Sequence, residues 1–479
     1  MDPRLLDRAV GVLLGSAAGD ALGVPYEFGV PPLDFEPEQK GGGLGGIAPG
    51  QWSDDTEMAC VIAQVAATGA DLRSVGALDA IADGFLRWFG DNPPDVGVQT
   101  RAVLSGVDRG SGAAARLRTW AAELHLRSGR TAGNGSLMRT GPVALAHLGD
   151  TAAIATAARA ISDLTHADPM AGDACVLWSL AIDHAVRTGA LDVRVGLPHV
   201  GEAWKSLISQ AELGEPASFA NNGWVVAAFQ AAWSALMRTS TLRDALVAAV
   251  RAGHDTDTVA AITGALGGAR YGGSGVPFAW RRRLHGWPGL HARDLTGLAV
   301  LAVRGGEPDA EGWPTGTHLP SYVGAGTEVV AHPDDAGVLL GAVGALRPGV
   351  ADAVVSLCRL GVAQVPLAGV PQEDHLETWL IDADDANNDV GLVLRDTAEA
   401  VRTLRAEGKT VLLHCVHAET RTPVSAAVYG ALVTGTPVAE AMQRVLSVLP
   451  TGSPRASLRH LAEELDIDAW ASTSQEGTR

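Results

Sequence analysis

Cysteine is scarce in this sequence, which has only Cys60, Cys175, Cys358 and Cys415 among 479 residues. The four are far apart and none belongs to a Cys-x-x-Cys pair, so the sequence predicts neither a disulfide framework nor a zinc knuckle. Cysteines used in this way are typical of a reducing compartment. We therefore expect a cytoplasmic protein.

Long apolar runs and basic residues are also lacking. No stretch of about twenty apolar residues is found, and the N-terminus from Met1 to Val10 has no apolar core of the signal-peptide kind, so we expect no membrane partner. Lys and Arg number 36 against 54 Asp and Glu, which gives a formal net charge of −18. This balance disfavours a broad nucleic-acid-binding surface, and it suits cation binding or simply a soluble surface.

Apolar residues make up 47% of the chain and charged residues 19%, a composition typical of a folded globular protein. The length exceeds what one core usually supports, so we expect two or three domains. From Leu5 to about Val303, Ala-rich segments with apolar residues three and four positions apart predict an all-α domain over residues 1–303. The clearest helical segments are Thr151 to Ser162, Gly172 to Thr188, Asn222 to Met237 and Thr241 to Ala252.

The pattern changes after residue 303. Residues 304–320 are rich in Gly and Pro and are predicted to be a linker. Beyond them, the Val- and Leu-rich runs Asp352 to Cys358 and Thr410 to His414 predict buried strands, and Val390 to Glu407 predicts a helix. Residues 321–479 are therefore expected to form an α/β domain, which makes the chain a multidomain protein.

The first predicted helix has a glycine at every fourth position from Gly11 to Gly23. A stripe of this kind lets another backbone approach closely. Glu27 follows Pro25 and is therefore predicted to lie outside the helix.

Two clusters of Asp and hydroxyl residues, Ser53 to Thr56 and Asp255 to Thr258, open predicted helices. One interpretation is that each cluster is a helix N-cap, a position that favours Ser, Thr and Asp. The other is that the two clusters face each other and bind divalent cations. Carboxylate and hydroxyl oxygens suit Mg²⁺ or Mn²⁺, and the lack of a nearby Cys or pair of His argues against zinc.

These residues resemble the ADP-ribosylglycohydrolases of the dinitrogenase-reductase-activating type over most of residues 5–300. The blocks that carry the resemblance are Gly15 to Glu27, Ser53 to Thr56, Asp95 to Gly97, Gly133 to Arg139, Leu164 to His166 and Asp255 to Thr258. The resemblance implies an all-α bundle that binds two Mg²⁺ (or Mn²⁺) ions. It also implies hydrolysis of the bond between ribose C1″ of ADP-ribose and a modified acceptor.

The resemblance further implies roles for individual residues. The implied metal ligands are Ser53, Asp54, Asp55, Asp255, Asp257 and Thr258. Glu27 would handle the substrate or the attacking water, and Asp95 would have a catalytic role. The implied ADP-ribose-binding residues are Asn134, Gly135, Ser136 and His166. An anionic pocket suits this reaction, because it stabilises oxocarbenium character at C1″.

Two residues depart from the family pattern, namely Ser53, where Thr is more frequent, and His254, where Gly is common. Ser53 keeps the ligating oxygen, so we expect metal binding to be retained. Taken alone, His166 would be interpreted as a core or helix-capping histidine, and Gly133 to Ser136 could be only a turn, but their positions in the family pattern favour the binding role.

Near the C-terminus, an apolar strand that ends at His414 is followed by Cys415, five residues, Arg421 and Thr422. A strand, a tight loop and a helix N-terminus together form an anion-binding cradle. The positive end of the helix favours the thiolate form of Cys415, and Arg421 could bind two phosphoryl oxygens. His414 and Thr422 complete the predicted phosphate site, with Thr422 assisting breakdown of a phosphocysteine. The competing interpretation is a buried structural cysteine, which is how we interpret Cys358.

This segment resembles the protein tyrosine and dual-specificity phosphatases over about residues 320–470. The resemblance implies an upstream aspartate that protonates the leaving oxygen. The candidates are Asp382, Asp384 and Asp385, and the count back from the next predicted helix favours Asp384, with Asp382 second. The loop departs from the usual glycine-rich form at Ala418 and Glu419, and Glu419 could repel a phosphoprotein substrate or point outward.

These observations lead to alternative hypotheses about function. The first is a bifunctional hydrolase with a metal-dependent ADP-ribosylglycohydrolase domain and a cysteine-dependent phosphatase domain. In the second, the C-terminal domain binds phosphate or ADP-ribose without catalysis. A third, in which the first domain is only a metal-binding scaffold, is disfavoured by the complete ligand set. The expected partners are an ADP-ribosylated protein or other ADP-ribosylated acceptor and a phosphorylated substrate, with nucleic acid expected only as a modified acceptor.

Overall fold

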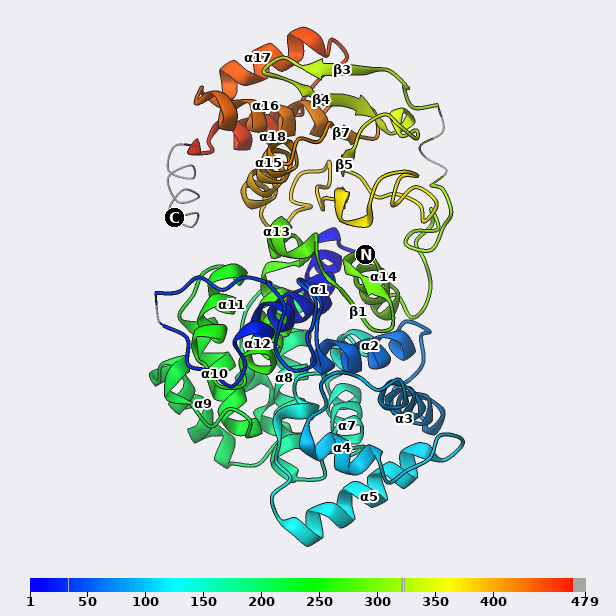
Figure 1. Cartoon of the computed structure of the whole chain (residues 1–479), viewed down its shortest axis with the longest axis vertical. Coiled ribbons are helices and arrows are strands. Elements are labelled where there is room, and N and C mark those ends of the chain that lie inside the picture. The colour runs from blue at the N-terminus through cyan, green and yellow to red at the C-terminus, as the bar shows by residue number, and fades with distance from the viewer. Residues whose placement is uncertain (33, 320–321, 323, 468–479) are drawn as a thin grey trace. The chain divides into compact units, whose positions relative to one another are not determined.

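The computed structural model describes residues 1–32, 34–319, 322 and 324–467. Contacts divide the chain into two compact units (Figure 1). The first unit comprises Met1, Arg8–Val276 and Arg283–Glu307, and the second comprises Asp2–Asp7, Pro277–Arg282 and Pro308–Arg479. The main division falls inside the expected linker. The predicted last residue of the linker, Pro320, and the predicted first residue of the second domain, Ser321, lie outside the described residues.

The first unit is built mainly of helices, which confirms the expected helical fold. In chain order the α-helices are α1 (Pro3–Gly23), α2 (Asp54–Ala66), α3 (Val75–Gly90), α4 (Val98–Leu104), α5 (Ala113–Ser128), α6 (Gly141–Ala146), α7 (Thr151–Ser162), α8 (Pro169–Thr188), α9 (Ala203–Leu213), α10 (Val225–Met237), α11 (Leu242–Arg251), α12 (Thr256–Tyr271) and α14 (Ala292–Val303). The short 3-10 helices are η1 (Val24–Tyr26), η2 (Asn134–Ser136), η3 (Val193–His199), η4 (Pro216–Ser218) and η5 (Gly273–Gly275). The first unit also contains a small antiparallel ribbon, β1 (His285–Gly286) with β2 (Leu290–His291), which the sequence pattern did not predict.

Side-chain caps explain where several of these helices begin. Asp150 accepts a hydrogen bond from the Ala153 N–H at the start of α7, and Asp168 accepts one from the Met170 N–H at the start of α8. Thr241 caps α11 in the same way. Each cap satisfies an N–H that lacks a partner within the helix and stabilises it by about 1 kcal/mol.

Helices α1 and α12 pack with their backbones in close contact, as the glycine stripe predicts. An ideal Cβ at Gly15 would lie 2.3 Å from the carbonyl oxygen of Gly264, and one at Gly23 would lie 2.4 Å from Cα of Asp257. Real Cβ atoms do not approach other atoms so closely, so these positions require glycine. The close approach places Asp20, in the last turn of α1, beside Asp257 in the first turn of α12.

Helix α1 is apolar as well as long. Together with η1 it spans Pro3–Tyr26, with a mean hydropathy of 1.2 over 18 residues, so by length and composition it could cross a membrane. However, 89% of that window is buried inside the structure. We therefore interpret α1 as a core helix of the first unit.

The second unit has an α/β fold with one five-stranded sheet among its described residues. Its strands are β3 (Val329–His332), β4 (Asp335–Ala342), β5 (Ala353–Ser356), β6 (His375–Glu377) and β7 (Val411–Cys415), and its helices are α13 (Phe278–Arg281), α15 (Val390–Ala406), α16 (Arg421–Thr434), α17 (Val438–Val448) and α18 (Ala456–Glu463), with the 3-10 helices η7 (Val343–Ala345) and η8 (Gln372–Asp374). The strand order is β3-β4-β7-β5-β6, in which β3 is antiparallel to β4 and the other pairs are parallel.

Strand β7 lies at the centre of this sheet, and all five of its residues are buried. Successive side chains of a strand point to opposite faces. Accordingly, Leu413 packs with Leu394 of α15 in the larger core, whereas Leu412 packs with Val354 in a smaller core on the other face. Because β5 and β7 are parallel, their C-terminal ends meet at one edge of the sheet, where Cys415 ends β7.

Candidate active sites

Carboxylates come together inside the first unit. They come from the end of α1, from the starts of α2 and α12, and from the turn after η1. Asp20 comes from the last turn of α1, Asp55 from the first turn of α2 and Asp257 from the first turn of α12. One carboxylate oxygen from each of these three lies within 4.8 Å of the others. A second group, with the same 4.8 Å limit, joins Asp257 to Asp255 and to Glu27, which follows η1. Because they share Asp257, we treat these five residues as one acidic cluster.

Asp20 anchors this cluster, although the motif analysis did not select it as a site residue. Its Oδ1 accepts hydrogen bonds from the backbone N–H of Ser53 at 2.9 Å and from its Oγ at 2.7 Å. Its Oδ2 accepts from the N–H of Thr56 at 3.0 Å and from its Oγ1 at 2.6 Å. Asp20 therefore holds the first turn of α2 in place. The available signal was its position next to Gly19, inside the glycine stripe that α12 approaches.

The two Asp and hydroxyl clusters do not act as side-chain N-caps. Ser53 is the N-cap residue of α2 but makes no capping bond within the described structure, and its Oγ lies 3.1 Å from Asp55 Oδ2. Asp255 is the N-cap residue of α12 and also makes no capping bond there. Its Oδ2 instead accepts a hydrogen bond of 2.8 Å from Nδ2 of Asn134. The side-chain oxygens of both helix starts therefore point into the acidic cluster and are not used for capping.

Crowding raises the pKa values of these carboxylates. Burial, followed by repulsion from neighbouring carboxylates, raises the pKa of Asp55 and of Asp257 well above the usual value. The same causes raise the pKa of Glu27 to about 8. In addition, Asp55 Oδ1 is buried without a hydrogen-bond partner among the described residues. A divalent cation fits these residues, because it would supply opposite charge and a ligand position for the unpaired oxygen.

The remaining predicted metal ligands and Asp95 border the acidic cluster. Thr258 Oγ1 lies 3.5 Å from Asp55 Oδ2. Asp54 is buried, and its Oδ2 accepts a hydrogen bond of 3.4 Å from the N–H of Gly97. Burial and then the charge of Asp95 raise the pKa of Asp54, and burial also raises the pKa of Asp95. Asp54 and Asp95 therefore lie in the same electrostatic environment as the acidic cluster without belonging to either group of three.

The predicted substrate loop contributes side chains in different directions. Asn134 is directed to the acidic cluster, because its Nδ2 donates to Asp255 and, at 2.9 Å, to the carbonyl oxygen of Asn222. Ser136 is buried, and its Oγ accepts hydrogen bonds from Ser162 Oγ at 2.9 Å and Cys175 Sγ at 3.4 Å. The Ser136 side chain therefore supports the loop from behind and does not face a ligand.

Gly135 and His166 lie against each other in this loop region. An ideal Cβ at Gly135 would lie 3.1 Å from Cε1 and 3.2 Å from Nε2 of His166. Glycine at this position therefore lets the backbone run along the edge of the imidazole ring. His166 is buried, and its burial lowers the pKa well below the usual value.

In the second unit, the strand, loop and helix around Cys415 follow the predicted order. Cys415 is the last residue of β7 and is buried, and α16 begins at Arg421. Arg421 Nη1 donates to the carbonyl oxygens of Leu357 at 2.6 Å and Leu380 at 3.2 Å. Its Nε is buried and makes no hydrogen bond to any described residue. Two backbone carbonyls thus fix the guanidinium, while its Nε forms only a long ion pair with Asp382.

The side chains of His414 and Thr422 have different surroundings. His414 is buried, and its Nε2 lies 2.7 Å from Ser356 Oγ, which in turn lies 3.0 Å from His375 Nε2. His414 therefore supports the sheet, and its side chain is not directed to a ligand. Thr422 Oγ1 is buried and has no hydrogen-bond partner in the described chain. A buried hydroxyl without a partner is expected where the group binds a ligand or contacts a nucleophile.

The three candidate general acids differ in position. Asp382 Oδ2 lies 3.9 Å from Nε of Arg421, the residue that follows the Cys415 loop, and its Oδ1 accepts a hydrogen bond of 3.3 Å from Nε of Arg455. The side chain of Asp384 is 64% exposed, and its Oδ1 accepts a hydrogen bond of 2.5 Å from Ser457 Oγ. Asp385 has a left-handed backbone with φ of 54°. The geometry favours Asp382, the second candidate of the sequence analysis, over Asp384.

The unusual residues of the loop also have a structural context. Ala418 is buried and has φ of 58°, a conformation that glycine adopts at lower cost, which explains why small flexible residues suit this position. Glu419 is exposed, and its carbonyl oxygen accepts a hydrogen bond of 2.8 Å from the N–H of Ser453. Its carboxylate is therefore in contact with solvent.

The family model described as ADP-ribosylglycohydrolase matches residues 1–309. The chain belongs to this family. The ADP-ribosyl-[dinitrogen reductase] glycohydrolase of Rhodospirillum rubrum is 32% identical over 299 residues, which cover 59% of this chain and 92% of the relative. The ADP-ribosylarginine hydrolase Tri1 of Pseudomonas putida (strain GB-1) is 32% identical over 289 residues, which cover 57% of this chain and 73% of the relative.

This ADP-ribosylglycohydrolase is thus a hydrolase of ADP-ribosyl glycosidic bonds from a metal-dependent family, and its acidic cluster could hold metal. Among solved structures, the crystal structure of DUSP15 aligns with 32% of this chain and 97% of its own, at 15% identity and a TM-score of 0.27. At this identity and TM-score no shared chemistry follows, and the chemistry of the second unit is inferred from its own residues.

The departure from the family at position 254 has a visible backbone context. His254 has φ of 63°, in the region that glycine adopts readily, which explains why Gly is common there. Its N–H and carbonyl oxygen form hydrogen bonds of 2.6 Å with Gly29 and Phe28. This bridge fastens the segment after Glu27 to the segment before Asp255, which keeps both carboxylates in the ADP-ribosylglycohydrolase site.

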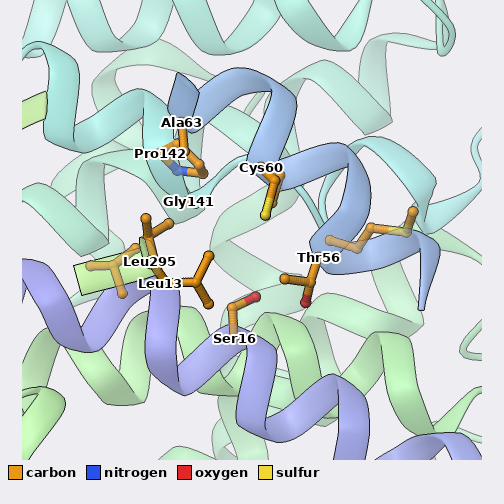
Figure 2. A pocket seen from close by; sticks show the side chains of 11 residues that line it. Leu13, Ser16, Thr56, Cys60, Ala63, Gly141, Pro142 and Leu295 are labelled. Atoms are coloured by element: carbon orange, nitrogen blue, oxygen red, sulfur yellow. The ribbon is translucent and has the colours of Figure 1, made fainter. Parts of the chain in front are cut away.

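A small pocket lies beside the acidic cluster, between α1, α2, α6 and α14 (Figure 2). Its lining is mostly apolar and includes Leu13, Pro142 and Leu295, with Cys60 on α2. Thr56, the residue that holds Asp20, is one of its few polar residues. The pocket has too few polar groups for a metal or ADP-ribose, so it is a gap in the helical core behind the site.

Proposed function

We propose that the first unit removes ADP-ribose from modified arginine side chains of proteins by hydrolysing the N-glycosidic bond at ribose C1″. The observation that carries this proposal is the acidic cluster, in which carboxylates from α1, α2, α12 and the Glu27 turn meet. The relatives named above support the choice of acceptor, because one is an ADP-ribosylarginine hydrolase and the other acts on dinitrogen reductase. An ADP-ribosylated protein is the proposed partner.

We assign two cations, Mg²⁺ or Mn²⁺, to this site. The assigned ligands are Ser53, Asp54, Asp55, Asp255, Asp257 and Thr258, supplemented by Asp20. When bound, such ions orient ribose hydroxyls and lower the pKa of water. The N-termini of α2 and α12 point into the site, and their positive ends favour the carboxylates located there.

The other residues act on the substrate. Glu27 is only partly buried and belongs to the acidic cluster. Bound cations would offset the repulsion that raises its pKa, and the resulting carboxylate would be placed to take a proton from the attacking water. Asp95 adds negative potential that stabilises positive charge at C1″ as the bond to the arginine nitrogen breaks. Asn134 fixes the orientation of Asp255. The hydroxyl of the attacking water bonds to C1″, and the departing arginine nitrogen takes up the other proton of that water.

The test is release of ADP-ribose from a peptide that carries ADP-ribosylarginine, measured with Mg²⁺, with Mn²⁺ and with a chelator. Asp257→Asn is expected to reduce turnover by about a hundredfold or more, because it removes a carboxylate shared by both groups of the acidic cluster. Asp108→Asn, at an exposed position, is the matched control and should retain turnover. Equal turnover of Asp257→Asn and wild type would refute the site, and release from ADP-ribosylserine alone would refute the arginine acceptor.

The second unit supports a second function, cysteine-dependent hydrolysis of a phosphate ester. The specific observation is Arg421, whose guanidinium is fixed by two carbonyl groups next to the Cys415 loop while its Nε lacks a hydrogen bond among the described residues. In this reaction Cys415 Sγ forms a bond to phosphorus, the ester P–O bond breaks, and Asp382 protonates the leaving oxygen. Water then cleaves the phosphocysteine to release phosphate.

Turnover of an aryl phosphate by the full-length chain tests this function. Cys415→Ser should abolish turnover, whereas the control Cys358→Ser, at another buried cysteine, should retain most of it. Asp382→Asn should slow release of a poor leaving group more than Asp384→Asn does. If wild type binds inorganic phosphate but shows no Cys415-dependent turnover, the second unit is a binding module and not a phosphatase.

A further inference from the structure

A buried arginine contacts the histidine of the substrate loop through one threonine. Arg139 Nη2 lies 2.6 Å from Thr165 Oγ1, and Thr165 Oγ1 lies 2.7 Å from His166 Nδ1. Each of the three residues is at most 1% exposed. The three groups form a continuous hydrogen-bonded relay from the core of the first unit to the substrate loop.

The arginine end of this relay is held rigidly. The guanidinium of Arg139 lies over the ring of Phe85, 4.5 Å from its centroid, and Nη1 donates to the sulfur of Met58 at 3.4 Å. No hydrogen bond joins Arg139 to a carboxylate among the described residues, so its buried charge is offset only through space, with Asp54 as the contributing carboxylate. Such an arrangement costs stability and suggests that Arg139 has a role other than packing.

The chemistry of the relay fixes the direction of its hydrogen bonds. A guanidinium only donates, so Thr165 Oγ1 accepts from Arg139. The hydroxyl has one proton, and His166 Nδ1 is the acceptor that the structure provides for it. If Nδ1 carried the proton instead, the buried hydroxyl of Thr165 would donate to nothing in the described chain, at a cost of about 1–3 kcal/mol. Nδ1 is therefore the acceptor, and the imidazole proton is on Nε2.

The protonated nitrogen faces the substrate loop. An ideal Cβ at Gly133 would lie 3.4 Å from His166 Nε2, and one at Gly135 would lie 3.2 Å from it. Two glycines thus leave space on the side of the ring where Nε2 lies, next to Asn134, which contacts Asp255 of the acidic cluster. Burial, followed by the nearby charge of Arg139, lowers the pKa of His166 well below its usual value, which favours the neutral ring.

We propose that Arg139 and Thr165 are positioning residues that hold His166 with its proton on Nε2, so that His166 donates a hydrogen bond to an oxygen of ADP-ribose bound along Gly133 to Gly135. This inference rests on the proposed ADP-ribosyl hydrolase function and adds a reason for the Arg139 side chain. A side chain that merely filled space would not determine which nitrogen of His166 carries the proton.

The tautomer is measured first, by nitrogen-15 NMR of imidazole-labelled full-length protein with Mg²⁺ present. The chain has 14 histidines, so the signal of His166 is assigned by its absence in His166→Gln. We expect protonated Nε2 and unprotonated Nδ1 in wild type. Protonation of Nδ1 in wild type would overturn the proposal, and this measurement requires no variant of the relay to fold.

The relay is then broken and restored. Thr165→Val removes the hydroxyl at similar volume and should change the tautomer population and weaken ADP-ribose binding about tenfold by calorimetry. Thr165→Ser keeps the hydroxyl and should restore both. Unchanged tautomer and affinity in Thr165→Val would overturn the proposal. The relay is tested by the tautomer of His166 and by the affinity for ADP-ribose. The proposed hydrolase function is tested by release of ADP-ribose from modified arginine, so failure of one proposal can be told from failure of the other.

Discussion

At the scale of single residues, the protonation state of a buried polar side chain depends on its burial and on the hydrogen bonds of its neighbours. His414 illustrates this, since its buried ring contacts Ser356 and burial lowers its pKa to about 4. An unfolded histidine has a pKa of about 6.5. Between these two values the unfolded chain binds a proton that the folded chain does not, so stability contributed by neutral His414 is present above pH 6.5 and is lost as pH falls toward 4.

We predict that lowering the pH from 7 to 4.5 costs about 2–3 kcal/mol of unfolding free energy through His414. The measurement is urea unfolding of wild type and His414→Gln at both pH values, with exposed His417→Gln as the control. The pH-dependent loss should be smaller in His414→Gln and unchanged in His417→Gln. An equal pH dependence in all three proteins would contradict the prediction.

At the scale of elements, the contact between α1 and α12 connects packing to the site. In an open helix position, Gly→Ala stabilises by about 1 kcal/mol because alanine is the better helix former. An ideal Cβ at Gly264 of α12 would instead lie 2.0 Å from the carbonyl oxygen of Gly15. The two helices would have to separate, which moves Asp20 away from Asp257.

We predict that Gly264→Ala destabilises the protein by about 1–3 kcal/mol and weakens Mn²⁺ binding. Gly76→Ala is a matched control, because Gly76 lies in helix α3 with no atom within 4 Å of its ideal Cβ. That variant should be as stable as wild type or slightly more so. Thermal unfolding and calorimetric titration with Mn²⁺ provide the measurements, and equal behaviour of the two variants would disprove this account of the contact.

The same elements show how far the sequence predicts the structure. Periodicity predicts α7 over Thr151–Ser162 as the structure has it, because one apolar face and an Asp150 cap define the helix locally. Asp20 was missed, because only the packing of α1 on α12 makes it a partner of Asp257. The general acid could not be chosen by counting, because the segment between β6 and α15 is irregular and its path determines that Asp382 faces Arg421.

At the scale of the whole molecule, the acidic cluster links cation binding to folding of the first unit. Carboxylates from α1, α2, α12 and the turn after η1 are buried close together and repel one another, which raises their pKa values. This repulsion destabilises the folded state. A cation bound only by the folded chain offsets the repulsion, and it stabilises that state by about 2.7 kcal/mol at a free concentration one hundred times Kd. None of these carboxylates belongs to the second unit, so we expect the effect to depend on the first unit.

We therefore predict that Mn²⁺ raises the unfolding temperature of wild type and that a chelator reverses the increase. Asp257→Asn should lose most of the shift, since both groups of the acidic cluster use Asp257, whereas Cys415→Ser should keep it in full. Calorimetric scans with and without Mn²⁺ provide the measurement. An Mn²⁺ shift of the same size in Asp257→Asn would place the cation elsewhere, and a shift lost in Cys415→Ser would place it in the second unit.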